Sequence, residues 1–192
     1  MKEKINVFDY AEQLNKALPQ GILLNTSGDK FNTMVIGWGQ LGTLWNLPTY
    51  TVYVRQSRYT KPQLDKTKEF TISAPVSGKL DREVFRICGT QSGRDVDKEK
   101  AANLTLVAAD EIQTPGIKEY PLTLECRVRS WDPEIGYLIG EIVASQADES
   151  ILTDGKVDLG KLKPIIFDPS FNVYRVVGEA VGNAFRDGLK LK

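Results

Sequence analysis

The sequence predicts a mainly β protein, an antiparallel barrel with short helices at its rim. Short apolar and β-branched segments between turn residues outnumber the segments that have helical spacing. The chain has 192 residues, 41% of them hydrophobic, which suffices for one sizeable core but not for two full catalytic domains. Because no internal repeat, low-complexity stretch or long linker divides the chain, we expect residues 1–192 to form a single domain.

The first part of the chain predicts one helix and three strands. Apolar residues recur at helical spacing in Val7–Leu18, which predicts a short amphipathic helix. The apolar runs Gly21–Asn25 and Phe31–Trp38 are separated by the turn residues Ser27–Lys30, as in a β-hairpin. Pro48–Arg55 then alternates Thr, Val and Tyr, which is typical of a half-buried strand.

Two short helices are predicted around a fourth strand. Ser57–Thr60 offers a helix cap, and Leu64–Glu69 completes the helix that it starts. Phe70–Pro75 has the composition of a strand. Asp81–Cys88 has apolar residues at helical spacing, and Gly89 is expected to end this second helix.

The rest of the chain predicts two further pairs of strands. Leu122–Val128 and Tyr137–Ser145 alternate as paired strands do, and the turn-rich segment Asp132–Glu134 joins them. Lys163–Asp168 and Val173–Val177 have a less regular strand pattern. Strands therefore dominate the predicted fold.

Charge and composition exclude several classes of function. The chain has 25 basic and 25 acidic residues, so its formal net charge is zero and we expect no nucleic-acid partner. It has no histidine, which excludes Ser-His-Asp and Cys-His catalysis and His-rich zinc sites. The longest apolar runs are too short to cross a bilayer, so we expect no membrane partner. Any chemistry must therefore use other groups or a cofactor.

Cys88 and Cys126 are the two cysteines of the chain. Their separation fits neither a CxxC redox pair nor a four-thiolate metal site, and the N-terminal sequence lacks the apolar segment of a secretory signal. Asp95 and Asp97 lack the rest of a calcium-binding loop pattern. We therefore expect reduced thiols, a cytoplasmic location and no metal.

The segment Gly37–Gly42 has the GxGxxG spacing of a dinucleotide-binding turn. That turn requires a following helix to hold pyrophosphate, whereas Thr43–Thr51 contains Pro48 and continues into a predicted strand. The glycines are better explained by a bulge or a close backbone approach in a barrel. We therefore expect no dinucleotide-binding domain of this type.

The segment Arg55–Thr60 is a candidate phosphate site, because a strand ends and a helix begins there. Helix N-terminal amides and the helix dipole favour an anion, guanidinium groups grip phosphate, and hydroxyls donate further hydrogen bonds. The alternative is an ordinary helix cap with solvent-exposed arginines. The candidate residues are Arg55, Ser57, Arg58, Tyr59 and Thr60.

Two other features have both a structural and a functional interpretation. The polar segment Cys88–Lys98 is either a solvated loop or the edge of a site. Trp38, Trp45 and Trp131 are either core residues, which is the commoner case, or platforms for a ligand ring. The sequence patterns do not decide between these interpretations.

Three segments in this order resemble the flavin reductase-like family, which includes flavoredoxins: FNTMVIGW at residues 31–38, TVYVRQSRYT at 51–60 and CGTQSGRDVDK at 88–98. The resemblance runs from about Gly21 to Val143, and LKPIIFD with YRVVGEAVGNAF near the end of the chain is also similar. It implies a split β-barrel, noncovalent FMN and a homodimer with the cofactor near the subunit interface.

The resemblance also implies roles for particular residues. Residues of the segment 55–60 would hold the FMN phosphate, those of 32–34 would line the isoalloxazine or ribityl group, and those of 88–98 would approach from another loop. Lys98 or Arg94 would stabilise the negative charge of reduced flavin, unless both form surface ion pairs. The candidate cofactor-binding residues are Asn32, Thr33, Met34, Arg55, Ser57, Arg58, Tyr59, Thr60, Cys88, Ser92, Gly93, Arg94 and Lys98.

The expected function is that of an FMN-dependent oxidoreductase that transfers electrons from NAD(P)H to flavin or another acceptor. Redox chemistry on a flavin needs no protein nucleophile, which agrees with the absence of histidine. One alternative is a flavoredoxin-like electron carrier reduced by a partner protein. Another is a barrel that binds a phosphorylated ligand or an oligonucleotide without catalysis.

Overall fold

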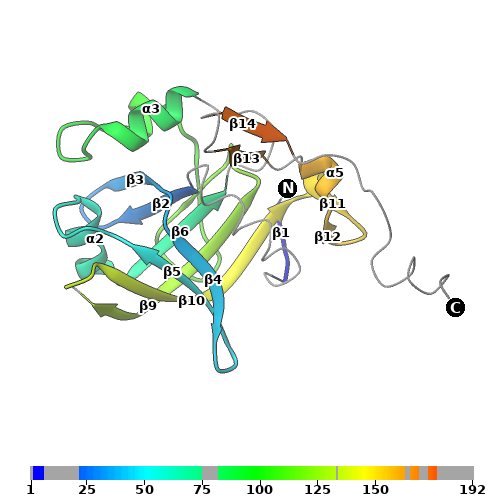
Figure 1. Ribbon diagram of the computed structural model, residues 1–192, viewed down its shortest axis with the longest axis horizontal. Helices are drawn as coiled ribbons and strands as arrows, with labels where there is room; N and C mark the ends of the chain where they lie inside the picture. The colour runs from blue at the N-terminus through cyan, green and yellow to red at the C-terminus, as the bar shows by residue number, and fades with distance from the viewer. Residues whose placement is uncertain are drawn as a thin grey trace, which may run out of the picture.

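An antiparallel sheet forms the centre of the protein (Figure 1). The structure is a computed structural model that describes residues 2–6, 22–74, 82–132, 134–162, 165–168 and 173–176. In these ranges the main sheet has eight strands in the order β3-β2-β6-β9-β10-β5-β4, with β1 paired to β10. The strands are β1 (Lys2–Lys4), β2 (Ile22–Ser27), β3 (Phe31–Ile36), β4 (Gly39–Leu44), β5 (Leu47–Tyr53), β6 (Glu69–Ala74), β9 (Leu122–Asp132) and β10 (Tyr137–Asp148).

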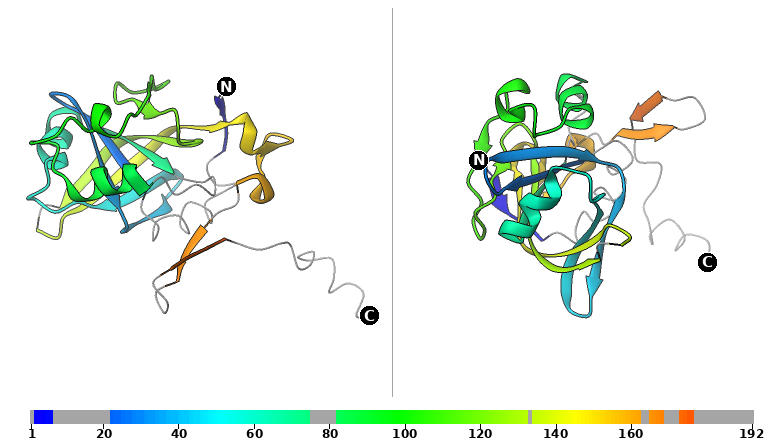
Figure 2. Two further views of the ribbon diagram at one scale, coloured as in Figure 1. Left: turned by 90° about the horizontal axis from the view of Figure 1, so that it is seen from above. Right: turned by 90° about the vertical axis from the view of Figure 1, so that its left-hand side faces the viewer.

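The sheet curls on itself and buries a different apolar cluster on each face (Figure 2). In β2, Ile22 and Leu24 join the cluster inside the barrel, whereas Leu23 between them joins the cluster outside it. Successive side chains of a strand point to opposite faces, so a strand buried on both sides is apolar throughout this run. Tyr50 and Phe70 are the largest fully buried side chains of the interior.

Short helices cover one end and one face of the barrel (Figures 1 and 2). Helix α2 (Thr60–Thr67) connects β5 to β6, and its Leu64 is buried in the interior cluster. Helices α3 (Arg82–Thr90) and α4 (Lys98–Ala101) pack on β3. The smaller elements are β7 (Leu106–Val107) with β8 (Gly116–Ile117), η3 (Glu149–Ile151), β11 (Leu152–Thr153) with β12 (Lys156–Val157), α5 (Leu159–Leu162), and β13 (Ile165–Asp168) with β14 (Val173–Val176). Every helix within the described ranges is too short or too polar to traverse a lipid bilayer.

Most of the predicted strands are present. The hairpin predicted between residues 21 and 38 is β2–β3, in which Leu24 pairs with Met34. The predicted pair near the middle of the chain is β9–β10, which is longer than expected and contains two irregularities. The two strands with the less regular pattern pair as β13–β14. The helix predicted over Val7–Leu18 lies outside the described residues.

The predicted ends of both helices are wrong. Helix α2 ends at Thr67 rather than Glu69, because Lys68 has a positive φ of 56° and turns the chain into β6. Helix α3 includes Gly89 and continues to Thr90, so Gly89 does not end it. A glycine near a helix end is a common stop signal, but neighbouring packing decides whether the helix continues.

Most of the glycine-rich segment 37–42 belongs to a strand that the sequence patterns did not predict. Residues Gly39–Leu44 are β4, which pairs with β5 without a register shift. A β-carbon on Gly42 would be no closer than 3.8 Å to the nearest described atom, so neither a bulge nor a close approach explains this glycine. The absence of a helix after Gly42 agrees with the rejection of a dinucleotide-binding turn.

The tryptophans do not follow the expectation that large aromatic residues belong to the core. Trp38 is 79% exposed and Trp45, in the turn between β4 and β5, is 93% exposed. Trp131 is partly buried, and the Lys61 ammonium lies 4.6 Å from the centre of its ring. The core expectation is therefore wrong for Trp38 and Trp45.

Candidate functional site

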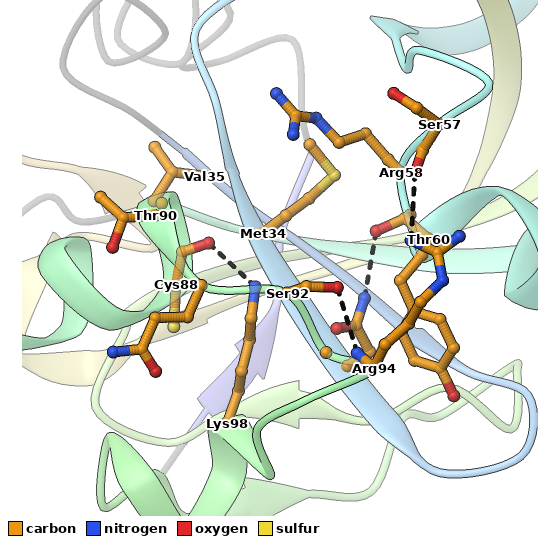
Figure 3. Close-up of a pocket in the computed structure, with 15 residues that line it drawn as sticks. Met34, Val35, Ser57, Arg58, Thr60, Cys88, Thr90, Ser92, Arg94 and Lys98 are labelled. Carbon is orange, nitrogen blue, oxygen red and sulfur yellow. Dashed lines mark hydrogen bonds between the residues drawn. The ribbon is translucent and has the colours of Figure 1, made fainter.

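A cavity of about 190 Å³ opens between β3, the start of α2 and the segment from α3 to α4 (Figure 3). It combines cationic, hydroxyl and apolar side chains, and no carboxylate is among its lining residues in the described part of the chain. Its lining residues are Asn32, Met34, Val35, Ser57, Arg58, Tyr59, Thr60, Cys88, Gly89, Thr90, Gln91, Ser92, Gly93, Arg94 and Lys98.

The structure brings together all the candidate cofactor-binding residues except Thr33 and Arg55. Thr33 acts on the site indirectly, because its backbone carbonyl accepts a hydrogen bond from the lining residue Lys98. Arg55 lies in the loop before α2 and does not line the cavity. Val35 and residues 89–91 also line the cavity, although neither the sequence patterns nor the resemblance pointed to them. Residues 89–91 lie at the end of α3 and just after it, between the predicted site residues Cys88 and Ser92. This position in the sequence could have indicated that they also line the cavity.

Lys98 is buried in the wall of the cavity, with 3% of its surface exposed. Its Nζ donates hydrogen bonds to the carbonyl oxygens of Thr33 (2.7 Å) and Cys88 (3.0 Å), so it joins β3 to α3. Burial lowers the pKa of Lys98, and the Arg58 guanidinium lowers it further, while Cys88 raises it. An ammonium has three N–H donors, and the third has no acceptor among the described residues.

The alternative that Lys98 forms a surface ion pair is therefore wrong, since the two hydrogen-bond partners of Lys98 are buried carbonyl groups. Helix α4 brings the side chain to this position. Asp97 caps α4 by accepting a hydrogen bond from the Lys100 N–H, and Lys98 is the first residue of the helix. A lysine held here directs positive charge into the cavity rather than into solvent.

Arg58 supplies a second positive charge at the start of α2. Its guanidinium is exposed and has no partner among the described residues, and Figure 3 shows it extending toward Met34. Helix α2 begins at Thr60 after the cap residue Tyr59, which makes no side-chain capping bond, and its first turn has no acidic residue. The predicted side-chain cap is therefore wrong. No acidic side chain of the first turn neutralises the positive end of the helix dipole, so this end of α2 favours an anion.

Thr60 is the first residue of α2, and its hydroxyl accepts a hydrogen bond from Asn32 Nδ2 at 3.0 Å. Asn32 is buried, and its Oδ1 has no donor among the described residues. A β-carbon on Gly93 would lie 2.0 Å from this Oδ1 and 2.7 Å from Tyr59 Cδ1. Position 93 therefore requires glycine, and a buried polar acceptor remains in the cavity wall.

Arg94 lies across one side of the cavity opening (Figure 3). Its guanidinium donates a hydrogen bond to the Ser57 carbonyl at 3.2 Å and lies 5.6 Å from the centre of the Tyr59 ring. Its backbone N–H donates to Ser92 Oγ at 3.2 Å. Arg94 therefore forms no ion pair with any residue that the structure describes, since these three partners are all uncharged.

The arrangement suits a ligand that has an anionic group at one end and a flat, less polar part at the other. Ser57, Arg58 and Thr60 lie at the anionic end, whereas Met34 and Val35 provide apolar surface. The volume is below the roughly 300–1,000 Å³ of typical small-molecule pockets, so these residues surround only part of such a ligand. Within the described ranges no cluster of three or more His, Cys, Asp and Glu side chains is placed to hold a metal.

Neither Cys88 nor Cys126 forms a disulfide within the described part of the chain, and both are buried. Cys88 is in the cavity wall at the end of α3, whereas Cys126 is inside the barrel. Burial raises the pKa of Cys126, which keeps that thiol protonated and unreactive. The expectation of two reduced thiols agrees with this placement.

Comparison with known proteins identifies similar chains. Residues 15–161 match the model of the flavin reductase like domain. A flavoredoxin from Methanosarcina acetivorans is 32% identical, with a TM-score of 0.74 over 90% of this chain and 91% of that one. A flavoredoxin from Desulfovibrio vulgaris is 29% identical, with a TM-score of 0.76 over 88% and 91% of the two chains.

A third structure confirms the fold. An FMN-binding domain of a flavin reductase-like enzyme from Shewanella baltica is 16% identical, with a TM-score of 0.78 over 95% of this chain and 97% of that one. The mainly β, antiparallel fold with short helices agrees with the sequence prediction, and proteins of this fold are split barrels.

Proposed function

Because this chain belongs to the flavin reductase-like family, we propose that its cavity binds FMN and that the protein is an FMN-dependent oxidoreductase using NAD(P)H. The observation that carries this proposal is the composition of the cavity, in which unpaired positive charge and apolar surface meet. Nearly all the residues suggested by the family resemblance lie in this one place. The geometry therefore supports the ligand class independently of the family.

The phosphate end of the proposed site is the start of α2. Arg58 would hold the phosphate through its unpaired guanidinium, close to the positive end of the α2 dipole. The backbone would contribute little, because the Lys61 N–H already donates to the Arg58 carbonyl and Pro62 has no N–H. Thr60 is already oriented by Asn32. Arg55, which does not line the cavity, would contribute less than Arg58.

The flavin end of the proposed site is the wall formed by β3 and α3. When bound, FMN would supply hydride acceptance and one-electron transfer. Lys98 would direct its third N–H toward the ring and stabilise negative charge there, while Met34 and Val35 would exclude water from one side. These residues fit the group, because the wall offers both a donor and apolar contact.

Nicotinamide would have to reach the same open cavity. Residues 39–42 of the glycine-rich segment lie in β4 and lead into β5 rather than into a helix, so the segment offers no separate dinucleotide site. We therefore expect nucleotide binding to be weak when FMN is absent.

An electron carrier is the second candidate function. The two flavoredoxins at 29% and 32% identity favour it. In that case a partner protein rather than NAD(P)H would reduce the bound FMN. Membership of a redox family favours both candidates over a barrel that binds phosphorylated ligands or oligonucleotides without catalysis.

We further propose that the protein is a homodimer, as the family resemblance implies. The small cavity volume supports this, because a second copy could complete a site that these residues surround only in part. Light scattering on the eluted protein at several concentrations tests it. A mass of one chain with FMN bound would contradict it.

The decisive experiment is a visible spectrum after FMN addition and desalting, followed by NADH or NADPH without oxygen. A flavin spectrum that elutes with the protein supports the site, and bleaching by either nucleotide supports the reductase. A retained flavin that neither nucleotide bleaches, but a reduced protein partner does, supports the carrier. Loss of all flavin on desalting, with no binding at equilibrium, contradicts both.

A further inference from the structure

We propose that Arg94 makes this site selective for a flavin that ends in a single phosphate, FMN, over the dinucleotide FAD. The inference rests on the proposed FMN site and identifies the residue that limits its ligand. Arg94 connects the segment after α3 to the start of α2, and thereby closes the phosphate end of the cavity (Figure 3).

Arg94 is exposed, but contacts hold both its backbone and its guanidinium in place. Its backbone N–H donates to Ser92 Oγ, and its guanidinium donates to the Ser57 carbonyl and stacks near the Tyr59 ring. The Lys30 ammonium lies 5.7 Å from the centre of the same ring. A guanidinium fixed by a carbonyl and an aromatic ring is preorganised, so little side-chain entropy is lost when an anion binds.

The backbone that carries Arg94 cannot easily move aside. Gly93 fits so closely between Asn32 Oδ1 and the Tyr59 ring that a β-carbon would overlap both. Asn32 is itself fixed by its hydrogen bond to Thr60. A ligand that extends beyond its first phosphate therefore meets a wall built from three segments of the chain.

Charge adds to this steric limit. The terminal phosphate of FMN is a monoester that concentrates about −1.5 to −2 charges on one group at neutral pH. In FAD each phosphate has one ester bond and one anhydride bond, so a similar total charge is spread over two groups with about one charge each. The Arg94 guanidinium has five N–H donors and uses one on Ser57, so others can face the phosphate. A single phosphate group held by Arg94 and Arg58 together therefore gains more when it is the FMN monoester than when it is one phosphate of FAD.

The test measures dissociation constants of FMN, FAD and riboflavin by quenching of flavin fluorescence, without any turnover. We compare the unmodified protein with Arg94→Ala, Arg94→Lys and a control, Arg86→Ala. Arg86 is an exposed arginine on α3 that pairs with Glu83 and does not line the cavity.

The unmodified protein should bind FMN at least about tenfold more tightly than FAD, a difference equivalent to one charge-assisted hydrogen bond. Arg94→Ala should weaken FMN and reduce the ratio of the two affinities about fivefold or more, because both the charge and the wall are lost. Arg94→Lys should recover part of the FMN affinity but less of the selectivity, since an ammonium cannot reproduce the planar contact with Ser57 and Tyr59. Arg86→Ala should change neither.

Equal affinity for FMN and FAD in the unmodified protein, or an unchanged ratio in Arg94→Ala, would overturn the role of Arg94 while leaving the FMN site intact. Failure of the unmodified protein to bind any of the three flavins would instead overturn the proposed function, and this inference with it. Riboflavin separates the contribution of the phosphate from that of the flavin ring, because it lacks the phosphate. Its affinity should therefore be the same in the unmodified protein and in both Arg94 variants.

Discussion

The interior of the barrel and the wall of the cavity share strand β3, but the residues that each region buries on this strand differ in chemistry. Ile36 of β3 is in the apolar interior with Tyr50 and Phe70. Asn32, four residues earlier on the same strand, is just as buried but lies among polar groups of the cavity wall. Position along one strand therefore separates a region that stabilises the fold from a region that can bind a ligand.

The two regions also differ in whether a ligand can reach their unsatisfied polar groups. Apolar side chains of the interior need only contact, which close packing provides. The Tyr50 hydroxyl in the interior and Asn32 Oδ1 in the cavity wall are both buried without a hydrogen-bond partner among the described residues, and each such group costs about 1–3 kcal/mol. A ligand in the cavity that donates a hydrogen bond to Asn32 Oδ1 would offset this cost, whereas Tyr50 does not line the cavity.

The largest expected effect is in the interior, on Phe70→Ala. Phe70 is fully buried, and its ring fills the space above Gly140, where a β-carbon would lie 2.4 Å from Cζ. Removing the ring leaves a cavity, so the free energy of unfolding should fall by about 3–5 kcal/mol in urea titrations. The FMN affinity of the folded variant should stay unchanged. A large change in that affinity would show that the two regions are coupled.

Lys98→Met is the corresponding change in the wall. FMN affinity should fall roughly tenfold to a hundredfold, because a charged donor is lost, as measured by equilibrium titration. Stability should fall less than in Phe70→Ala, since relief of a buried charge offsets part of the cost of two lost hydrogen bonds. Lys100→Met is the control, because Lys100 is an exposed residue of the same helix and pairs with Asp97. Equal effects from both variants would refute a specific role for Lys98.

Arg58→Ala should weaken FMN binding by about 1.5–3 kcal/mol, the loss of one charge-assisted hydrogen bond, with the lower value favoured by its exposure. The free energy of unfolding should change by less than about 0.5 kcal/mol, as for other exposed positions. Arg55→Ala, in the same loop but outside the cavity lining, should have a smaller effect. If both arginines can be removed without loss of FMN, the phosphate site has been misplaced.

The Lys98 charge also predicts a dependence on pH. Burial lowers its pKa below the ordinary value for lysine, whereas a bound phosphate-bearing anion would raise it again. FMN affinity should therefore be constant below the lowered pKa and decrease as the pH rises through the window between the two values. In Lys98→Arg the guanidinium stays charged, so titrations from neutral to alkaline pH should show a flatter profile. Identical profiles would exclude Lys98 as the titrating group.

The same shift fixes the sign of the effect on stability. The unfolded chain holds the Lys98 proton more tightly than the folded protein does, because the folded pKa is the lower one. The contribution of Lys98 to the free energy of unfolding should therefore rise with pH between the lowered pKa and about 10.4, the value in the unfolded chain.

The smallest effect is expected for Cys88→Ser. Cys88 contributes its carbonyl oxygen to Lys98, and this backbone group is retained in the variant. FMN binding and turnover should persist, with a small decrease in thermal stability because a hydroxyl replaces a buried thiol. Spectra and steady-state rates measure this. Loss of turnover with FMN still bound would assign the thiol a role in the reaction.

The sequence determined most strands of the main sheet and most of the residues that line the cavity. Alternation and turn residues are local signals, so the hairpin β2–β3 and the pair β9–β10 were predicted before any contact was known. The segment order also identified the residues that gather at the cavity, through their resemblance to a family. Strand β4 was missed because its glycines resemble a turn, and only pairing with β5 makes it a strand.

Tertiary structure decided the environment of each functional group. Lys98 meets the Thr33 carbonyl across 65 positions of the chain, and Arg94 meets Ser57 across 37. No local pattern indicates that one lysine in a charged segment will be buried, or that Arg58 will line the cavity while Arg55 will not. Local propensity selects the strands and helices, whereas burial, pKa and unsatisfied hydrogen bonds depend on which distant segments pack together.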